Sequence, residues 1–337
     1  MSAARTPGEK SMRSIHCARL LAILTAALCS SLVAQEFPVK PVRVVVPFPP
    51  GGVDVSIRQM QKIMSDELGQ PILIDNRPGA NGFIGTELVA RSAPDGYTVL
   101  ATSSSTMISG VLVSSNVPFD VLRDFTPITM INMTVSTLIT KPGVAFTSVK
   151  ELIDYAKRNP GKVSYASTGI GSAQHLDGEY FKVTAGVDLN HIPYKGFGPV
   201  VQAVAAGEVD VAFMTVAAAN PLLQGGKARP LAFYNGPRAP SLPPATPELT
   251  AIVPQFRATP GWIGLLGPAG LPRAVLARLN TAAVKSLSPE MRARNAETGT
   301  TIIGDTPEEF SAKIKTGLEN TARVVKQLKS IGVKFED

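Results

Sequence analysis

The chain has 337 residues, of which 44% are hydrophobic and 18% charged, and its formal net charge is +7. Its 33 lysines and arginines are scattered, with no basic run and no interleaving of basic and aromatic residues, so we expect no nucleic-acid partner. A chain of this length is longer than one hydrophobic core usually serves, which predicts two domains.

The first 34 residues have the pattern of a secretory signal peptide. Basic residues at the start are followed by an apolar stretch from Leu20 to Leu28, and Leu32-Val33-Ala34 forms a cleavage site before Gln35. The apolar stretch is too short to span a membrane. Met12 is an alternative start and Ser31 an alternative cleavage position. We therefore expect residues 1–34 to be removed from an exported protein.

Both cysteines of the chain, Cys17 and Cys29, lie within this segment. The exported chain is then expected to contain no disulfide, and its net charge falls to about +4. Its stability must come from a large core.

Strand-like and helix-like segments alternate almost to the end of the chain. The expected strands are residues 42–46, 72–74, 97–101, 163–166, 189–192, 209–213 and 231–234. Apolar residues at helical spacing predict helices around residues 57–64, 149–156, 200–205, 275–283 and 310–328. This alternation favours an α/β fold with parallel layers.

Two segments are candidates for crossings between the domains. Residues 131–140 form one long strand-like run, and a proline-rich stretch, residues 237–260, precedes Trp262. We expect a discontinuous first domain, residues 35–138 and 259–337, and a second domain of residues 139–258. Two α/β lobes joined twice form a hinged clamp with a ligand cleft between them. Trp262 is expected to pack the hinge, or alternatively to cover the ligand.

Two glycine turns stand out because each follows a strand-like run and precedes a helix-like one. They are Pro47–Gly52 and Asn76–Gly85. Such corners leave unpaired backbone N–H groups at a helix start, where the dipole favours negative charge. Each turn alone is as often a simple connection. Their repetition indicates a site that holds an anion with backbone groups.

Two more loops follow expected strands and carry hydroxyl groups. They are Thr102–Thr106 and Ser167–His175. Open α/β sheets bind ligands at the carboxyl ends of their strands. Hydroxyls and free amides there can bind a carboxylate through charge-assisted hydrogen bonds. The glycines of the second loop lack the spacing of a dinucleotide fingerprint.

Catalytic and metal-binding patterns are absent from the sequence beyond residue 34. It has two histidines, His175 and His191, and no nucleophile elbow or metal-ligand motif. We expect no catalytic residue, metal or cofactor. The rival interpretation is a hydrolase with Ser172 as nucleophile, His175 as base and Asp177 as orienter, although this spacing rarely gives the geometry. His175 is expected to cap a helix or contact the ligand, and His191 to end a strand.

Several short strings resemble those of one protein family. In the first half they are Pro47–Gly52, Asn76–Gly82 and Ala93–Thr98. In the second half they are residues 156–162, Gly171–Leu176, Pro193–Gly196 and residues 206–210. Their order and spacing are similar to those of the Bug-type substrate-binding proteins of tripartite tricarboxylate transporters. The resemblance runs from about Phe37 to the C-terminus.

The resemblance implies a periplasmic, two-lobed binding protein of type II (Venus-flytrap) architecture. Such a protein would capture a small organic carboxylate by clamp closure, as a monomer, and deliver it to a membrane permease; a sensor partner using the same pocket is the alternative. It implies ligand-binding roles for Phe48, Gly51, Gly52, Asn81, Gly82, Phe83, Ser103, Ser104, Ser105, Ser167, Ser172 and His175, with Thr215 as a further position.

The chain departs from the family pattern at the first glycine turn. Only Val53 separates Gly52 from Asp54, where the family usually has two residues. One residue fewer at a helix start rotates the following side chains by about 100°. The second turn has Asn81 where the family usually has glycine, which adds an amide within reach of a ligand.

Overall fold

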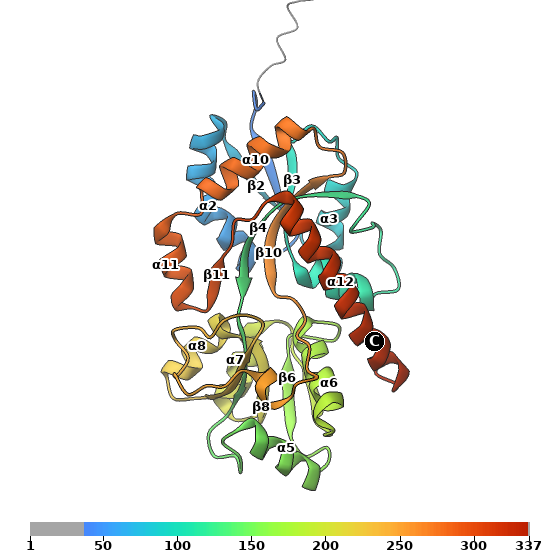
Figure 1. Cartoon of the computed structure of the whole chain (residues 1–337), viewed down its shortest axis with the longest axis vertical. Helices are drawn as coiled ribbons and strands as arrows, with labels where there is room; N and C mark the ends of the chain where they lie inside the picture. Colours follow the sequence, from blue (N-terminus) through green and yellow to red (C-terminus); the bar gives the residue numbers. More distant parts are fainter. Residues whose placement is uncertain (1–36, 336–337) are drawn as a thin grey trace, which may run out of the picture. The chain divides into compact units, whose positions relative to one another are not determined.

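A computed structural model of the chain describes residues 37–335, so the predicted signal peptide with Cys17 and Cys29 lies outside the described residues. Within residues 40–335 there are two β-sheets, drawn one above the other in Figure 1, and helices pack on both. We call the part built on the six-stranded sheet the first lobe and the part built on the five-stranded sheet the second lobe. In the described part of the chain, no helix has the length and apolar character to cross a membrane.

The first lobe contains a six-stranded sheet in the order β11-β4-β10-β3-β1-β2. Its strands are β1 (Val42–Val46), β2 (Ile72–Asn76), β3 (Thr98–Ser103), β4 (Phe125–Thr134), β10 (Trp262–Pro268) and β11 (Thr300–Ile302). Its helices are α2 (Gly52–Leu68), η1 (Ala80–Gly82), α3 (Phe83–Ala90), η2 (Ser105–Gly110), α4 (Val111–Val113), α10 (Arg273–Lys285), α11 (Pro289–Glu297) and α12 (Pro307–Ser330). The chain steps outward from β1 to β2 and then back across β1 to β3, so right-handed connections place α2 and α3 on opposite faces (Figure 1).

The second lobe contains a five-stranded sheet in the order β7-β6-β8-β5-β9. Its strands are β5 (Ser136–Thr140), β6 (Ser164–Ser167), β7 (Asn190–Pro193), β8 (Val211–Thr215) and β9 (Arg229–Tyr234). Its helices are α5 (Val149–Arg158), α6 (Ala173–Ala185), α7 (Phe197–Ala206), α8 (Val216–Gln224) and α9 (Leu249–Ile252). Each of β6, β7 and β8 is followed by a helix start, and these starts point toward the first lobe (Figure 1).

Parallel pairing is confirmed for β1 with β2 and β3 and for β6 with β7 and β8, but both sheets are mixed. In the first sheet β10 runs antiparallel to β3 and β4, and in the second β5 runs antiparallel to β8 and β9. The chain enters both β10 and β5 from the other lobe, whereas the parallel strands beside them run toward that lobe. These two strands therefore have the opposite direction. The alternation of strands and helices in the sequence does not report this direction.

The run 131–140, expected as one strand, is two strands that belong to different sheets. It divides at Val135, between β4 and β5. The backbone of Val135 bonds to both lobes: its N–H donates to the carbonyl of Gly299 (2.9 Å), and its carbonyl accepts from the N–H of Val216 (2.9 Å). The domain limits at 138/139 and 258/259 stay a prediction, which the passage of the chain between sheets at Val135, and again between β9 and β10, supports.

The expected helices form because their apolar stripes are buried and their ends are capped. On α2, Ile57, Met60 and Met64 are at most 2% exposed. On α12, Thr306 and Glu309 form a reciprocal capping box. Each lobe thereby encloses its own buried core.

The C-terminal part of α12 packs on both lobes. Its buried apolar residues share a cluster with Val113 of the first lobe and Leu176 on α6 of the second. Phe335, beyond the helix, belongs to the same cluster and contacts the ring of His175 edge-on at 5.7 Å. Figure 1 shows this end of α12 beside α6. The two lobes therefore also pack against each other at this end of α12, away from the two crossings.

Candidate functional site

A cavity of about 790 Å³ lies between the two lobes. The first lobe lines it with Phe48, Gly52, Val53, Val55, Ser56, Gln59, Asn81, Ser103, Ser104, Ser105, Asn132, Thr134, Pro260, Gly261, Trp262, Ile263, Asn295, Thr298 and Thr300. The second lobe and the crossings line it with Ser136, Thr168, Ile170, Gly171, Ser172, Ala173, Gln174, Asp177, Gly196, Phe197, Thr215, Ala217, Ala218 and Thr259. Most of these residues follow β1, β2, β3, β6, β7 or β8, at the carboxyl ends of strands as expected, and the others lie on β4, β11, α11 and the two crossings.

The N-terminus of α2 opens onto this cavity through Gly52 and Val53. Its N-cap residue is Gly51, with no side-chain cap, so the first N–H groups of a 17-residue helix have no side-chain acceptor. Asp54 is the third helical residue and not the cap; its Oδ2 accepts from Arg58 Nε at 2.8 Å. That hydrogen bond is the main cause that lowers the pKa of the Asp54 carboxyl. Arg58 thus offsets the one acidic charge near this helix start.

The second glycine turn has four successive residues with positive φ. They are Gly79 (132°), Ala80 (46°), Asn81 (53°) and Gly82 (88°), and for alanine and asparagine this conformation is strained. Thr106 holds the turn, because its Oγ1 donates to the carbonyl of Asn81 at 2.9 Å. The N–H of Gly82 bonds to Gly79 O, which leaves the N–H groups of Ala80 and Asn81 without a hydrogen-bond acceptor among residues 37–335. Successive N–H groups in such a turn form an anion-binding concavity.

The serine-rich loop after β3 forms the floor of the first-lobe side. Ser103, Ser104 and Ser105 all line the cavity, at the junction of β3 and η2. Ser104 Oγ accepts from the backbone N–H of Trp262 at 3.1 Å. The Trp262 ring lies edge-on to Phe310 with centroids 5.0 Å apart and is 4% exposed. Trp262 is therefore both a core residue and a part of the cavity wall.

In the second lobe, two helix starts that reach the cavity are capped by their own side chains. Ser172 Oγ accepts from the N–H of His175 at 3.2 Å, and Thr215 Oγ1 accepts from the N–H of Ala218 at 3.3 Å. The third, α7, begins after Gly196 without a side-chain cap. The first lobe therefore offers uncapped backbone at two corners, whereas in the second lobe only the start of α7 is uncapped.

His175 and Ser167 lie behind the cavity wall. The His175 ring stacks on that of His191 with centroids 4.2 Å apart, and its Nδ1 accepts from the N–H of Gly171 at 3.0 Å. Ser167 is fully buried, and its Oγ lies 2.7 Å from Nε2 of His191. Burial lowers the pKa of both imidazoles to about 4. The two imidazoles are therefore neutral near pH 7, and they support the 168–172 loop through hydrogen bonds and ring stacking.

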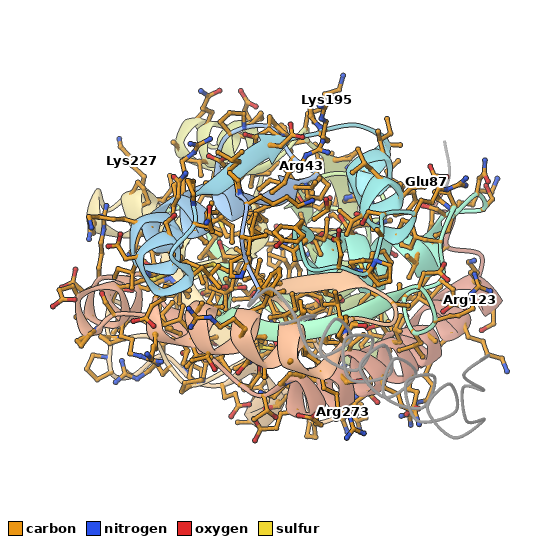
Figure 2. All side chains as sticks on the ribbon, turned by 90° about the horizontal axis from the view of Figure 1, so that it is seen from above. Arg43, Glu87, Arg123, Lys195, Lys227 and Arg273 are labelled. Carbon is orange, nitrogen blue, oxygen red and sulfur yellow. The ribbon has the colours of Figure 1, made fainter. Side chains whose placement is uncertain are left out.

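Asp177, on the second turn of α6, is the ionisable residue of the cavity lining. It is 3% exposed, and its Oδ1 accepts from the backbone N–H of Thr259 at 2.8 Å. Burial raises the pKa of its carboxyl to about 7, although the Thr259 N–H and the hydroxyls of Thr259 and Tyr234 act in the opposite direction. No lysine, arginine or histidine of the described residues lines the cavity. Figure 2 shows labelled cations such as Lys195 and Lys227 directed outward.

The structure brings most of the predicted site residues to the cavity. Eight of them line it: Phe48, Gly52, Asn81, Ser103, Ser104, Ser105, Ser172 and Thr215. Gly51 caps α2 just outside the lining, and Gly82 closes the second turn. Phe83 is a core residue, edge-on to Phe119 at 5.4 Å, and Ser167 and His175 lie in the second layer described above. Their roles toward a ligand stay a prediction.

Sequence reasoning missed a group of lining residues near the crossings. Asn132, Thr134, Ser136 and Thr259 lie where β4, β5 and the return segment meet. The sequence pattern predicts one continuous strand over residues 131–140, and therefore no strand end there. In the sequence, Asp177 has a role only in the rival hydrolase interpretation, as the partner of a catalytic histidine. The signal that could have found it is an acid in the second turn of a helix whose start is capped by Ser172.

The hydrolase interpretation has no geometric support. Ser172 Oγ accepts the N–H of His175, whereas His175 Nδ1 accepts the N–H of Gly171. Asp177 Oδ1 is bonded to Thr259 rather than to an imidazole. Ser172, His175 and Asp177 therefore do not form the series of hydrogen bonds, from nucleophile to base to orienter, that a hydrolase needs.

Two mixed α/β lobes, crossed twice by the chain and enclosing a cavity lined by backbone and hydroxyl donors, define a two-lobed solute-binding protein. The family model described as "Tripartite tricarboxylate transporter family receptor" matches residues 56–329. The chain therefore belongs to this receptor family, whose members are solute-binding proteins and not enzymes.

Three relatives show how far the similarity extends. Protein BugT of Bordetella pertussis is 34% identical over 319 residues, which are 92% of this chain and 97% of that protein. The structure of R. palustris Rpa4515 with adipate is 31% identical with a TM-score of 0.76, covering 86% of this chain and 98% of that one. MatC from Rhodopseudomonas palustris with bound malate is 28% identical with a TM-score of 0.74, covering 86% and 100%. The resemblance seen in the sequence is thereby confirmed along nearly the whole chain.

Proposed function

We propose that this protein captures a small organic carboxylate in the cavity between its lobes. The observation that carries the proposal is the pair of uncapped backbone corners in the first lobe, at Gly51–Val53 and at Gly79–Gly82. Both corners have free N–H groups at a helix start or in a left-handed turn, and both reach the same cavity. Such groups stabilise a carboxylate without a charged side chain.

The family and its solved members support the same ligand class. Two relatives of this fold have been solved with adipate and with malate, both of which are small carboxylates. In this chain the hydroxyls of Ser103, Ser105 and Thr168 add neutral donors around the two corners. We expect the first lobe to hold the carboxylate and the second, through Ser172 and Thr215, to close on it.

Clamp closure is the proposed mechanism of capture. A ligand that contacts both lobes binds the closed arrangement better than the open one, and this difference in affinity drives closure. The closed form would then be recognised by a membrane permease of the tripartite tricarboxylate type in the periplasm, where a signal peptide at residues 1–34 would direct the chain. The family to which the chain belongs supports this delivery role.

A thermal-shift screen of the chain from Gln35 onward tests carboxylate capture. The panel contains mono-, di- and tricarboxylates, aromatic acids and amino acids, each against its amide as an uncharged control. At a hundred times its dissociation constant, a ligand stabilises the fold by about 2.7 kcal/mol, which raises the melting temperature by several degrees. Stabilisation by an acid and not by its amide supports the proposal. Equal stabilisation by both, or none by any acid of the panel, contradicts it.

Delivery is tested separately with the ligand that this screen identifies. Vesicles containing a tripartite-type permease are incubated with the labelled ligand, with and without the binding protein. Uptake that requires the protein supports delivery. Capture without such uptake limits the proposal to ligand binding.

A further inference from the structure

Asp177 has no role in the proposed capture of a carboxylate, yet it lies on the wall of the same cavity. It projects from α6 of the second lobe, whereas the uncapped corners belong to the first lobe. The cavity therefore has two chemically different sides: one rich in N–H donors, and one with an acidic acceptor.

Among residues 37–335, the groups that act on Asp177 include no cation. Its neighbours are the N–H and hydroxyl of Thr259 from the return crossing and the hydroxyl of Tyr234 from β9, all of which are uncharged. Lys182, on the same helix, is paired instead with Glu179 (3.2 Å) and Asp188 (3.7 Å). A carboxylate has about four acceptor positions, more than these neighbours use, so Asp177 can still accept from a ligand.

We propose that Asp177 is a specificity-determining residue that selects amino carboxylates, whose ammonium group it receives while the first lobe holds the carboxylate. This inference rests on the proposed function of the same cavity. A buried carboxylate without a cationic partner is costly, and a ligand ammonium would supply that partner when the cavity closes. A dicarboxylate would instead place a second negative charge in a cavity whose described lining contains no cation.

The experiment compares ligand pairs that differ only in one terminal group. The pairs are β-alanine with succinate, 4-aminobutyrate with glutarate, and 5-aminovalerate with adipate, measured by calorimetry at pH 8. In at least one pair we expect the amino carboxylate to bind at least tenfold more tightly. Asp177→Asn keeps the shape and the acceptor for Thr259 but removes the charge. It should weaken this ligand by about 30-fold or more, because a buried charge pair is lost.

Asp154→Asn is the matched control, because Asp154 is an exposed acid on α5 of the same lobe. It should leave the affinity for both ligands unchanged.

The wild-type protein offers a second test that needs no variant. Because burial raises the pKa of Asp177 to about 7, the ammonium ligand should bind about tenfold more weakly at pH 6 than at pH 8.

The outcomes separate this inference from the proposed function. Dicarboxylates that bind as tightly as their amino partners in all three pairs overturn it and leave carboxylate capture standing. Amino-carboxylate affinity that is unchanged in Asp177→Asn, or that does not vary between pH 6 and pH 8, also overturns it. Failure of every acid, in these pairs and in the wider panel, overturns both proposals.

Discussion

The two lobes present different chemistry to one cavity. The first lobe meets it with backbone that its own side chains do not cap, at Gly51–Val53 and Gly79–Gly82. The second meets it with three helix starts: at Ser172 and Thr215 a hydroxyl accepts one N–H group, and only the start of α7 at Gly196 is uncapped. Both sets of loops follow strands, so position in the fold does not distinguish them. The state of the helix caps shows which lobe has donors left for an anion.

The largest expected effect comes from breaking the first-lobe turn at Gly82. A Cβ there would lie 2.7 Å from Thr106 Oγ1, and φ is +88°, so Gly82→Val displaces the hydroxyl that holds Asn81. We expect carboxylate affinity to fall at least a hundredfold. The left-handed conformation should also cost about 1–2 kcal/mol of unfolding free energy. Calorimetry and chemical denaturation measure the two quantities.

Gly69→Val is the matched control for Gly82→Val. Gly69 lies in the same lobe, has a φ of +71°, and has no atom near the position of its Cβ. It should show a similar loss of stability with unchanged binding. If Gly82→Val binds as the wild type does, the first-lobe turn does not hold the ligand.

A second, smaller effect is expected where the lobes pack against each other. A Cβ at Gly299 of the first lobe would lie 2.8 Å from Val216 and 2.9 Å from Ala239 of the second. Gly299→Ala should wedge the lobes apart, weaken the ligand about tenfold and cost about 1–3 kcal/mol of stability. Small-angle scattering with and without ligand measures the incomplete closure.

Gly270→Ala separates the wedge from the backbone strain. Gly270 has a φ of +86° in the first lobe, and its Cβ would meet open space. This variant should close normally. Normal closure of Gly299→Ala as well would show that the contact with Val216 and Ala239 does not limit the clamp.

A substitution at a helix cap on the second-lobe side of the cavity should lower the stability of the protein more than its affinity for the ligand. Ser172→Ala removes the cap of α6 and should cost about 1 kcal/mol, with ligand affinity changed less than tenfold. Ser148→Ala is its match, because Ser148 caps α5 through Glu151 N at 3.2 Å, away from the cavity. A loss of affinity in Ser172→Ala far beyond tenfold would place the anion on the second lobe and so contradict the difference between the lobes.

The sequence predicted more of the fold than of the site. Strand 42–46 has the same limits in the structure, and most other expected strands are displaced by one or two residues. Alternating elements report local structure, so they could not show that β5 and β10 run against their neighbours. The division at Val135 depends on two hydrogen bonds to distant residues, Gly299 and Val216, which no local pattern encodes.

For the site, the loops were predictable because strand ends and glycine turns are visible in the sequence. Whether a residue of such a loop faces the cavity was not. Phe83 and Ser167 belong to the expected loops but are turned into the packed layers behind the wall. Asp177 shows the opposite error, because its burial and its contact with Thr259 arise from a segment 82 residues away.

The smallest expected effect concerns how each group in the second lobe contributes to stability as the pH changes. Burial lowers the pKa of His175 and His191 from 6.5 to about 4, so the unfolded chain binds more protons there, and unfolding free energy rises from pH 4 to pH 6.5. Burial raises the pKa of Asp177 from 3.8 to about 7, so here the folded state holds the proton, and stability falls over that range.

In the wild-type protein two imidazoles oppose one carboxyl, so these groups should still make its ligand-free stability rise between pH 5 and pH 6.5, but less steeply than the imidazoles alone would. Asp177→Asn removes the falling contribution. Its unfolding free energy should therefore rise with pH more steeply than that of the wild type, by at most about 1.4 kcal/mol per pH unit. Denaturant unfolding at several pH values, with Asp154→Asn as the control, measures the slopes. Equal slopes in Asp177→Asn and the wild type would mean that Asp177 is ionised in the folded lobe at pH 5, and the acidic side of the cavity would then be charged even without a ligand.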